Sequence, residues 1–315
     1  MMLQRQNASG HPDAQLMSRA EGVKGRSLMA DARRRLFRNR AAVAGMVLLG
    51  IITLMAIFAR YLSPYAFSDQ DYNVISCAPS WWPGEDVICR AGGAHWFGTD
   101  AVGRDLFVRT LYGAQVSLAV GIVATLVSLA IGVLYGAAAG FIGGKANAVM
   151  MRAVDILYSL PFIFFVIILM VIFNQNFVLL FVAIGAVSWL TMARIVRGQT
   201  LSAKQKEFVE AARAAGVSTF GIIRRHIVPN VVGPVIVYVT LTIPGVILAE
   251  SFLSFLGLGI REPYTSWGVL ISEGAGQMDS APWTLIFPGL FMAVTLFCFN
   301  FSGDGLRDAL DPKDR

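Results

Sequence analysis

The chain has 315 residues, of which 56% are hydrophobic and only 15% are charged, and its mean hydropathy is +0.61. This composition is too apolar for an ordinary soluble domain and predicts an integral membrane protein. The net charge of +6 is compatible with a nucleic-acid partner. No segment, however, combines basic and aromatic residues as a nucleic-acid platform does, so we expect no such partner.

The first forty residues are polar and lack the apolar core of a cleavable signal peptide. We expect about the first 25 of them to be disordered. In residues 27–40, Leu28, Ala32 and Leu36 recur at helical spacing among five arginines. The pattern predicts either a basic amphipathic helix held at the membrane by anionic lipid headgroups, or an unstructured basic flank.

Six segments come close to the roughly 20 apolar residues that a membrane-spanning helix needs. They are residues 41–59, 116–138, 155–173, 177–193, 231–255 and 284–301. The polar run Asn174, Gln175 and Asn176 predicts a sharp turn between the third span and the fourth. We therefore predict an all-α polytopic membrane protein with six transmembrane helices.

The predicted spans divide the chain into five parts. They are an N-terminal arm (1–40), a first transmembrane helix (41–61), an outside loop (62–112), a five-helix core (113–303) that includes a polar loop (203–230), and a tail (304–315). Of the 26 Lys and Arg residues, 21 lie in the arm, the tail and the loops on the same side. By the positive-inside rule, both termini and the polar loop are expected to be cytoplasmic.

The outside loop contains two of the three cysteines, Cys77 and Cys89. In an oxidising compartment they could form a disulfide worth about 3 kcal/mol, and two free thiols are the alternative. No histidine or further cysteine stands at metal-binding spacing, so we expect no metal site. The loop either packs on the outer end of the helices or helps to dock a partner protein.

Residues 95–105 read His-Trp-Phe-Gly-Thr-Asp-Ala-Val-Gly-Arg-Asp and precede the second span. Thr99 or Asp100 is expected to cap the helix that comes next, and Gly98 and Gly103 to permit tight turns. Between the second and third spans, residues 140–145 contain three glycines and a lysine. Since Ala replaces the first glycine and the magnesium-binding hydroxyl of a phosphate loop, we expect no ATP site there.

Polar residues and prolines near the spans leave several readings open. Asp155 is expected to cap the third span or to pair with Arg152, and Pro161 to be tolerated inside that helix. Glu250 and Ser254 stand towards the outer end of the fifth span. Glu250 either has a structural role and reaches the interface, or lines a substrate path or its outer gate with Ser254.

The polar segment 207–230 lies between the fourth and fifth spans and predicts two short helices. Its first helix is indicated by residues at helical spacing: Phe208, Ala211, Ala212 and Ala215. Gly216 is expected to stop that helix in a left-handed conformation, Ser218 to cap the second and Pro229 to end it. The alanines either present a flat docking surface or only reflect helix propensity.

This segment resembles the EAA loop of the permease subunits of binding-protein-dependent ABC importers. The matching positions are Glu210, Ala211, Ala212, Gly216, His226, Ile227 and Pro229. The general pattern has Ile and Leu where this chain has His226 and Val228, and its ending is similar to the peptide-transporting branch. Residues 95–105 and 299–312 also resemble that branch, the tail most closely its oligopeptide members, and the glycines of the tail predict a helix stop.

The resemblance implies a type I ABC importer permease fold in the bacterial inner membrane, and a C-type permease subunit of an oligopeptide importer. It implies a heterodimer with a homologous permease, two cytoplasmic ATPase subunits and an external peptide-binding protein. The 207–230 loop would couple the ATPases to the spans, with Glu210 making polar contacts and Gly216 providing the bend. ATP and magnesium would be bound by the ATPases, so the chain itself would hold no cofactor and catalyse no reaction.

Alternative functions remain both within the same family branch and in other classes of membrane protein. A dipeptide or nickel importer permease of the same branch would share these motifs. An ion-gradient-driven transporter would show buried charges near the membrane midplane, which the predicted spans almost lack. A membrane protease has little support, because the three histidines lie outside the spans and neither HExxH nor GxSxG occurs.

Overall fold

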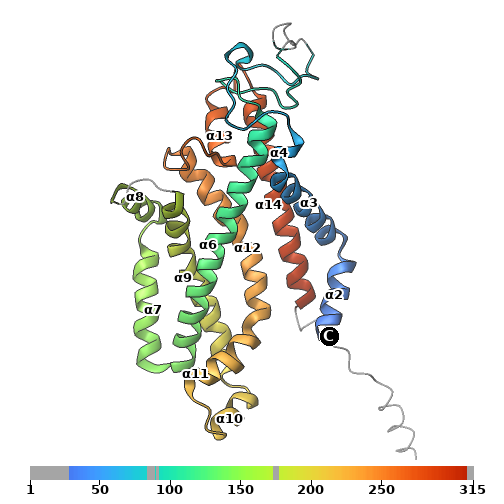
Figure 1. The fold of residues 1–315 in the computed structure, drawn as a ribbon. Helices are drawn as coiled ribbons and strands as arrows, with labels where there is room; N and C mark the ends of the chain where they lie inside the picture. The colour runs from blue at the N-terminus through green and yellow to red at the C-terminus, as the bar shows by residue number, and fades with distance from the viewer. Residues whose placement is uncertain (1–27, 84–88, 90–91, 173–176, 311–315) are drawn as a thin grey trace, which may run out of the picture.

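The computed structural model describes residues 28–83, 89, 92–172 and 177–310 (Figure 1). Its helices are α2 (Leu28–Arg38), α3 (Arg40–Ile57), α4 (Ala59–Leu62), η1 (Tyr72–Val74), α6 (Leu106–Ile142), α7 (Gly144–Ser159), α8 (Phe162–Ile172), α9 (Phe177–Ala203), α10 (Glu207–Ala214), α11 (Thr219–Ile222), η2 (Ile223–Ile227), α12 (Val228–Phe255), α13 (Trp267–Ala275) and α14 (Trp283–Leu310). Apart from one isolated bridge, these residues form no strand pairing, which confirms the all-α prediction.

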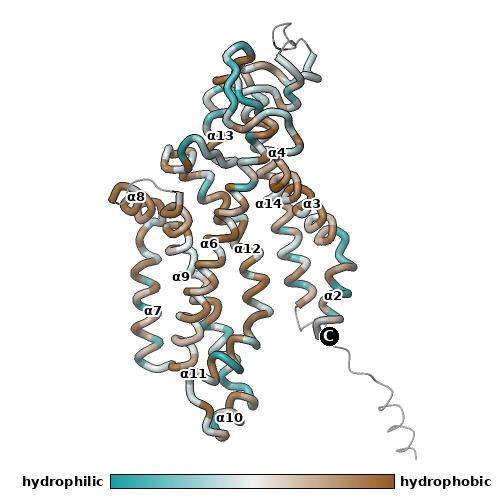
Figure 2. The backbone as a smooth tube through the Cα atoms, viewed as in Figure 1, coloured by the Kyte–Doolittle hydropathy of each residue, from teal (hydrophilic) through white to brown (hydrophobic). Residues whose placement is uncertain are grey.

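Five helical segments are long and apolar enough to cross a membrane. They are Arg40–Ile57, Leu106–Ile142, Phe181–Ala203, Thr219–Phe255 and Trp283–Leu310. The bent pair α7 and α8 makes a sixth span if it is counted as one. Figure 2 shows hydrophobic residues along these helices and hydrophilic ones in the loops above α13 and around α10 and α11.

The third predicted span, residues 155–173, is wrong in its start and in its continuity. Helix α7 already begins at Gly144, and it meets the next helix at an angle of 85°. Pro161 is the cause, because the residue before a proline avoids the helical region, and Leu160 is extended with ψ 129°. The predicted turn at 174–176 lies outside the described residues.

The α7 carboxylate also has a different partner from the one expected. Asp155 lies inside the helix and pairs with Arg194 of α9 at 2.9 Å, so it neither caps a helix nor pairs with Arg152. The Arg194 guanidinium also lies 4.3 Å from the ring centroid of Tyr158. These contacts join α7 to α9 across 39 positions of sequence.

Helix α6 makes its most extensive contacts with α9, and glycine allows the approach. A Cβ added at Gly140 would lie 2.8 Å from Thr200 Cβ and 2.9 Å from the Arg197 carbonyl oxygen. Gly132 and Gly136 face α9 in the same way, against Met192 and Ala193. Small residues at this spacing permit close packing in a membrane, where apolar side chains gain little by leaving lipid.

Glycine has the same use at the end of α14, where a helix stop was wrongly predicted. The helix continues through Gly303 and Gly305 to Leu310. A Cβ at Gly303 would lie 2.8 Å from Leu241 of α12, and one at Gly305 would collide with Ala42 of α3. Helix α2, which lies in the basic arm, also packs on α14, with Ala32 buried.

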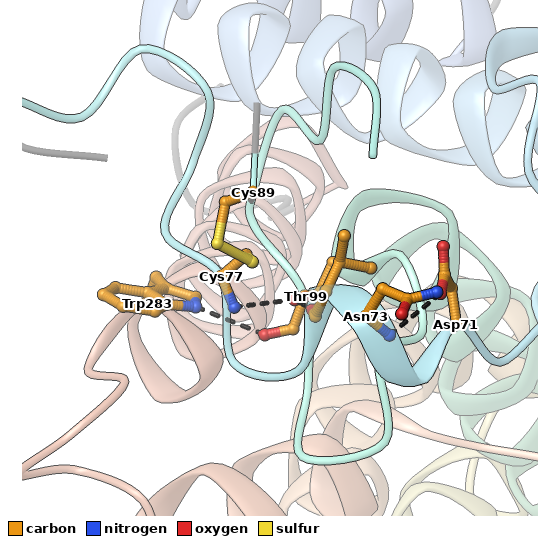
Figure 3. The surroundings of a disulfide bond; sticks show 7 residues. Asp71, Asn73, Cys77, Cys89, Thr99 and Trp283 are labelled. Carbon is orange, nitrogen blue, oxygen red and sulfur yellow. Dashed lines mark hydrogen bonds between the residues drawn. A yellow bond between two sulfur atoms is a disulfide. The ribbon is translucent and has the colours of Figure 1, made fainter. Parts of the chain in front are cut away.

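The described residues between 63 and 105 form a cap over one end of the helix bundle (Figure 1). Cys77 and Cys89 are joined by a disulfide, which decides between the two readings of these thiols. The Cys77 amide donates to the Thr99 hydroxyl at 2.8 Å, and the Trp283 indole donates to the Thr99 carbonyl at 3.3 Å (Figure 3). The cap is thereby fixed to the start of α14.

Candidate functional site

The loop between α9 and α12 carries the residues that the sequence singled out. Helix α10 ends in a Schellman motif, in which the Gly216 amide donates to the Arg213 carbonyl at 3.0 Å and the Val217 amide to the Ala212 carbonyl at 3.1 Å. Gly216 has φ +75°, as expected, and the Ser218 hydroxyl accepts from the Gly221 amide. The predicted stop and start, two residues apart, are both confirmed.

One side of the loop is buried against the end of α6. Val209, Ala212, Ile222 and Ile227 share an apolar cluster with Phe141. The Lys204 ammonium donates to the Phe141 carbonyl, and the Arg213 guanidinium lies 5.1 Å from its ring centroid. The loop is therefore fixed to the helix bundle rather than suspended from two flexible ends.

The other side of the loop is open. Glu210, Ala211 and Gly216 are exposed, and a Cβ added at Gly216 would meet no atom within 4 Å. Phe220 is also 68% exposed. The open side thus combines a carboxylate, a small flat surface and an apolar side chain.

The predicted end of the second helix at Pro229 is wrong. Helical geometry continues through Pro229, which lies just after the π-helical turn η2, and such a local π adjustment lets a membrane helix tolerate the missing N–H. The π-helical turn η2 runs directly into α12, so one helical segment extends from Thr219 to Phe255. His226 is half-buried in this turn, and its carbonyl accepts from the Asn230 side chain at 2.6 Å.

A cavity of about 520 Å³ lies higher in the bundle, between the α7–α8 break, α9 and α12. Five of its lining side chains carry hydroxyl groups: Tyr158, Ser188, Thr191, Tyr238 and Thr242. The remaining lining residues are apolar, and none is an acid, a lysine or an arginine. Its size falls in the range of small-ligand sites, which are mostly apolar with a few polar groups.

Glu250 and Ser254 do not line this cavity, and Glu250 does not reach the interface. Glu250 is fully buried, and its Oε1 accepts from the hydroxyls of Ser254 and Ser266 at 2.7 Å each. Ser266 also caps α13 through the Val269 amide. The carboxylate thus joins α12 to α13 inside the chain, in keeping with the structural reading.

An ionic network connects the cap to the segment before α13. Arg104 Nε donates to Asp100 Oδ2 at 2.7 Å, and its Nη1 donates to Glu262 Oε1 at 2.6 Å. Arg109 pairs with the same Asp100 carboxylate and lies 3.4 Å from Glu273. Asp100 and both arginines are buried, whereas Glu262 is exposed.

Two of the three acids of this network, Asp100 and Glu262, have a lowered pKa. Burial pushes the pKa of Asp100 up, but the charge of Arg109 and hydrogen bonds from Arg104 and Val102 outweigh it, so the pKa lies below its usual value. The hydrogen bond and charge of Arg104 likewise lower the pKa of Glu262. Asp100 and Glu262 are therefore ionised at neutral pH.

The helix cap in this region differs from the prediction. Asp105, and neither Thr99 nor Asp100, caps α6 by accepting from the Val108 amide at 2.8 Å. Its other oxygen contacts His95 Nδ1 at 2.9 Å. Gly98 and Gly103 adopt φ +77° and +75°, as the tight-turn prediction required.

Comparison of the sequence with known families gives a match over most of the chain. The family described as "Binding-protein-dependent transport system inner membrane component" matches residues 131–315, more than half of the chain. The chain belongs to this family. The "N-terminal TM domain of oligopeptide transport permease C" matches residues 27–79. The inner-membrane component is therefore joined to a second known module that contains the arm and the first span.

Curated relatives of this inner-membrane component match over nearly the whole chain. It is 56% identical to the oligopeptide transport system permease protein OppC of Haemophilus influenzae over 93% of this chain and 91% of that one. It is also 56% identical to OppC of Escherichia coli over both full lengths. The dipeptide transport system permease protein DppC of Bacillus subtilis is 45% identical over 94% and 90%.

A solved structure supports the fold at low sequence identity. The MetNI methionine ABC transporter in inward-facing conformations matches with a TM-score of 0.51 and 18% identity, over 65% of this chain and 96% of that one. The type I permease fold expected from the sequence is thus confirmed for the core. Among the described residues, no group of three or more metal-ligating side chains lies together.

Sequence reasoning missed the cavity hydroxyls and the arginine network. A signal for the cavity was present, because Ser188 and Thr191 are three positions apart and Tyr238 and Thr242 four apart, so each pair shares a helix face. No comparable signal marked the contact of Arg104 with Glu262, which are separated by 158 positions.

Proposed function

We propose that this chain is the permease subunit of an ATP-driven oligopeptide importer and forms half of its translocation pathway. The observation that carries the proposal is 56% identity to an oligopeptide permease over the full length of both chains. The exposed, capped helix in the EAA position adds the geometry that a coupling subunit needs.

The loop would transmit movement because it is continuous with a membrane span. The apolar side of α10 is packed on Phe141 of α6, and the helical segment from Thr219 to Phe255 is unbroken. A force on the exposed side, at Glu210 and Gly216, would therefore move α6 and α12 together. This supports a coupling role for the loop between ATPases and the outward- and inward-facing states of the spans.

The partners are inferred from the family and from the faces of the chain. A homologous permease would complete the pathway as a heterodimer, and two cytoplasmic ATPase subunits would contact the open side of the 203–230 loop. A peptide-binding protein would deliver substrate at the outer cap. ATP and magnesium would be held by the ATPases, so that this chain would hold no cofactor and break no covalent bond.

The proposed location is the bacterial inner membrane, with both termini cytoplasmic. The positive-inside distribution of Lys and Arg supports this orientation. In Figure 1, α2, the end of α14 and α10 lie towards one end, while the disulfide-bonded cap lies at the other. A disulfide is stable in an oxidising compartment, which fits a cap outside the cytoplasm.

Peptide uptake tests the proposal. Cells with and without this chain are given a labelled tetrapeptide and a labelled dipeptide, with and without cellular ATP. We expect deletion to abolish ATP-dependent tetrapeptide uptake. The 45% identity to a dipeptide permease supports a second candidate, and selective loss of dipeptide uptake would establish it instead. Unchanged uptake of both, in cells lacking other peptide transporters, would refute both.

A further inference from the structure

The cavity between α7, α9 and α12 is lined by five hydroxyl groups, although these helices are largely apolar. Its hydroxyl side chains belong to helices apolar enough to span a bilayer, where polar groups are costly and commonly mark a transport path. Two of them face the cavity from α9 and two from α12. The fifth, Tyr158, lies in the last turn before the α7–α8 break.

The hydroxyl groups of Ser188 and Thr242 can each accept a further hydrogen bond. The Ser188 hydroxyl donates to the Ile184 carbonyl at 2.9 Å, and the Thr242 hydroxyl to the Tyr238 carbonyl at 2.8 Å. The Tyr238 hydroxyl also interacts with the hydroxyls of Thr191 and Thr242. A hydroxyl oxygen has two lone pairs, so Ser188 and Thr242 each keep at least one for an N–H group in the cavity. The aliphatic lining between them, with Leu241 and Val246 among its residues, offers no charge to select one side chain over another.

We propose that this cavity binds the main chain of the transported peptide in an extended conformation. The inference rests on the proposed function and adds a site to it. An extended peptide brings unpaired N–H and C=O groups that the hydroxyls complement. A lipid tail has no such groups, and a partner's transmembrane helix has already paired its own, so neither occupant would use the five hydroxyls.

Main-chain recognition also explains why the lining is uncharged. A site that read peptide side chains would need groups matched to each of them, and specificity would narrow accordingly. Hydroxyls that contact the repeating amide accept peptides of different sequence. Substrate selection by side chain would then have to be made elsewhere.

Cysteine protection in the assembled transporter tests the site. Thr242→Cys and Thr240→Cys are each introduced with Cys298→Ala, since the two remaining cysteines form the disulfide. Thr240 is the matched control, because it is on the same helix but its hydroxyl lies beside Gly303 of α14. The complex with its partner permease, ATPases and binding protein is reconstituted in proteoliposomes and treated with a charged, water-soluble thiol reagent.

We expect the reagent to modify the cysteine at 242 and not the one at 240. A tetrapeptide at about nine times its Kd, delivered by the binding protein, should slow modification at 242 roughly tenfold. No modification at 242 would mean that lipid or a partner helix covers the cavity. Modification at the same rate with and without peptide would mean a water-filled cavity that binds no peptide. Either result overturns the inference.

Wild-type uptake in the same proteoliposomes separates the two claims. If the wild type transports no peptide, the proposed function fails and the inference fails with it. If it transports peptide while the cysteine at 242 is unprotected, only the inference fails. Thr242→Val should lower uptake of tetra-alanine and of a lysine-containing tetrapeptide by the same factor, about tenfold for one lost hydrogen bond. Thr240→Val should change uptake less than about twofold.

Discussion

Replacement of Gly216 offers a direct test of the loop geometry. Gly216 holds φ +75° at the end of α10, and an added side chain would meet no atom of this chain within 4 Å. A substitution there therefore acts through the backbone and not through a clash. The left-handed conformation costs a residue with a Cβ about 1–2 kcal/mol, and Val, being β-branched, tolerates it poorly.

The structure gives a magnitude for the effect. Only Val209 and Ala212 of α10 are buried, so little packing opposes the loss of the cap. A cost of about 1–2 kcal/mol lowers the ratio of capped to uncapped loop by a factor of about 5–30. We expect Gly216→Val to raise the ATP hydrolysed per imported peptide at least about fivefold, because ATPase movement is no longer transmitted to α12.

The matched control is Gly216→Asn. Asn also adds a side chain, but it adopts the left-handed conformation far more readily than Val. The ratio of ATP hydrolysed to peptide imported is measured in proteoliposomes, after the yield of assembled complex has been checked. A wild-type ratio for Gly216→Val would refute the reasoning. Equal damage from Asn would show that the open surface, and not the turn, is what the ATPase requires.

The remaining predictions concern stability. Asp100→Asn should lower the free energy of unfolding by about 3–5 kcal/mol, because it leaves two buried arginines without their shared carboxylate. Glu262→Gln, which changes an exposed side chain, should lower it by at most about 1 kcal/mol, and thermal unfolding compares the two variants. The pKa of Asp100 is lowered below 3.8, so its ion pairs stabilise the fold above about pH 4, and this stabilisation is lost as the pH falls through the lowered pKa. A melting temperature that rises on acidification from about pH 5 to 3 would contradict this. Cys77→Ala should lower the stability of the cap by about 3 kcal/mol, and limited proteolysis from the outside should become faster. Unchanged cleavage would mean that the disulfide stabilises the cap by less than this value. Gly305→Ala should destabilise the packing of α14 on α3 by about 1–3 kcal/mol, whereas Gly289→Ala, which has open space around it, should not destabilise the protein. Similar melting temperatures for the two variants would show that close packing at Gly305 is not required.

The local features of the 207–230 loop could be predicted from the sequence alone. A glycine after a run of alanines and a serine two positions later specify a helix stop and a helix cap, because both signals act on amides within a few residues. The apolar segments predicted membrane helices for the same reason, since in lipid a continuous helix is the one local way to pair every backbone group. Pro229 misled the prediction, because the helical segment continues through it from the π-helical turn η2 and does not end there.

Tertiary structure decided the features that depend on distant partners. The sequence left Cys77 and Cys89 bonded or free, and only the folded cap places them together. Glu250 accepts a hydrogen bond from Ser266, and Asp155 forms an ion pair with Arg194. The residues between the partners do not specify either contact. The cavity hydroxyls were visible as pairs on α9 and α12, but which helix faces meet is set by packing. Local hydrogen bonding is therefore readable from neighbouring residues, whereas a site assembled across helices exists only once the bundle has formed.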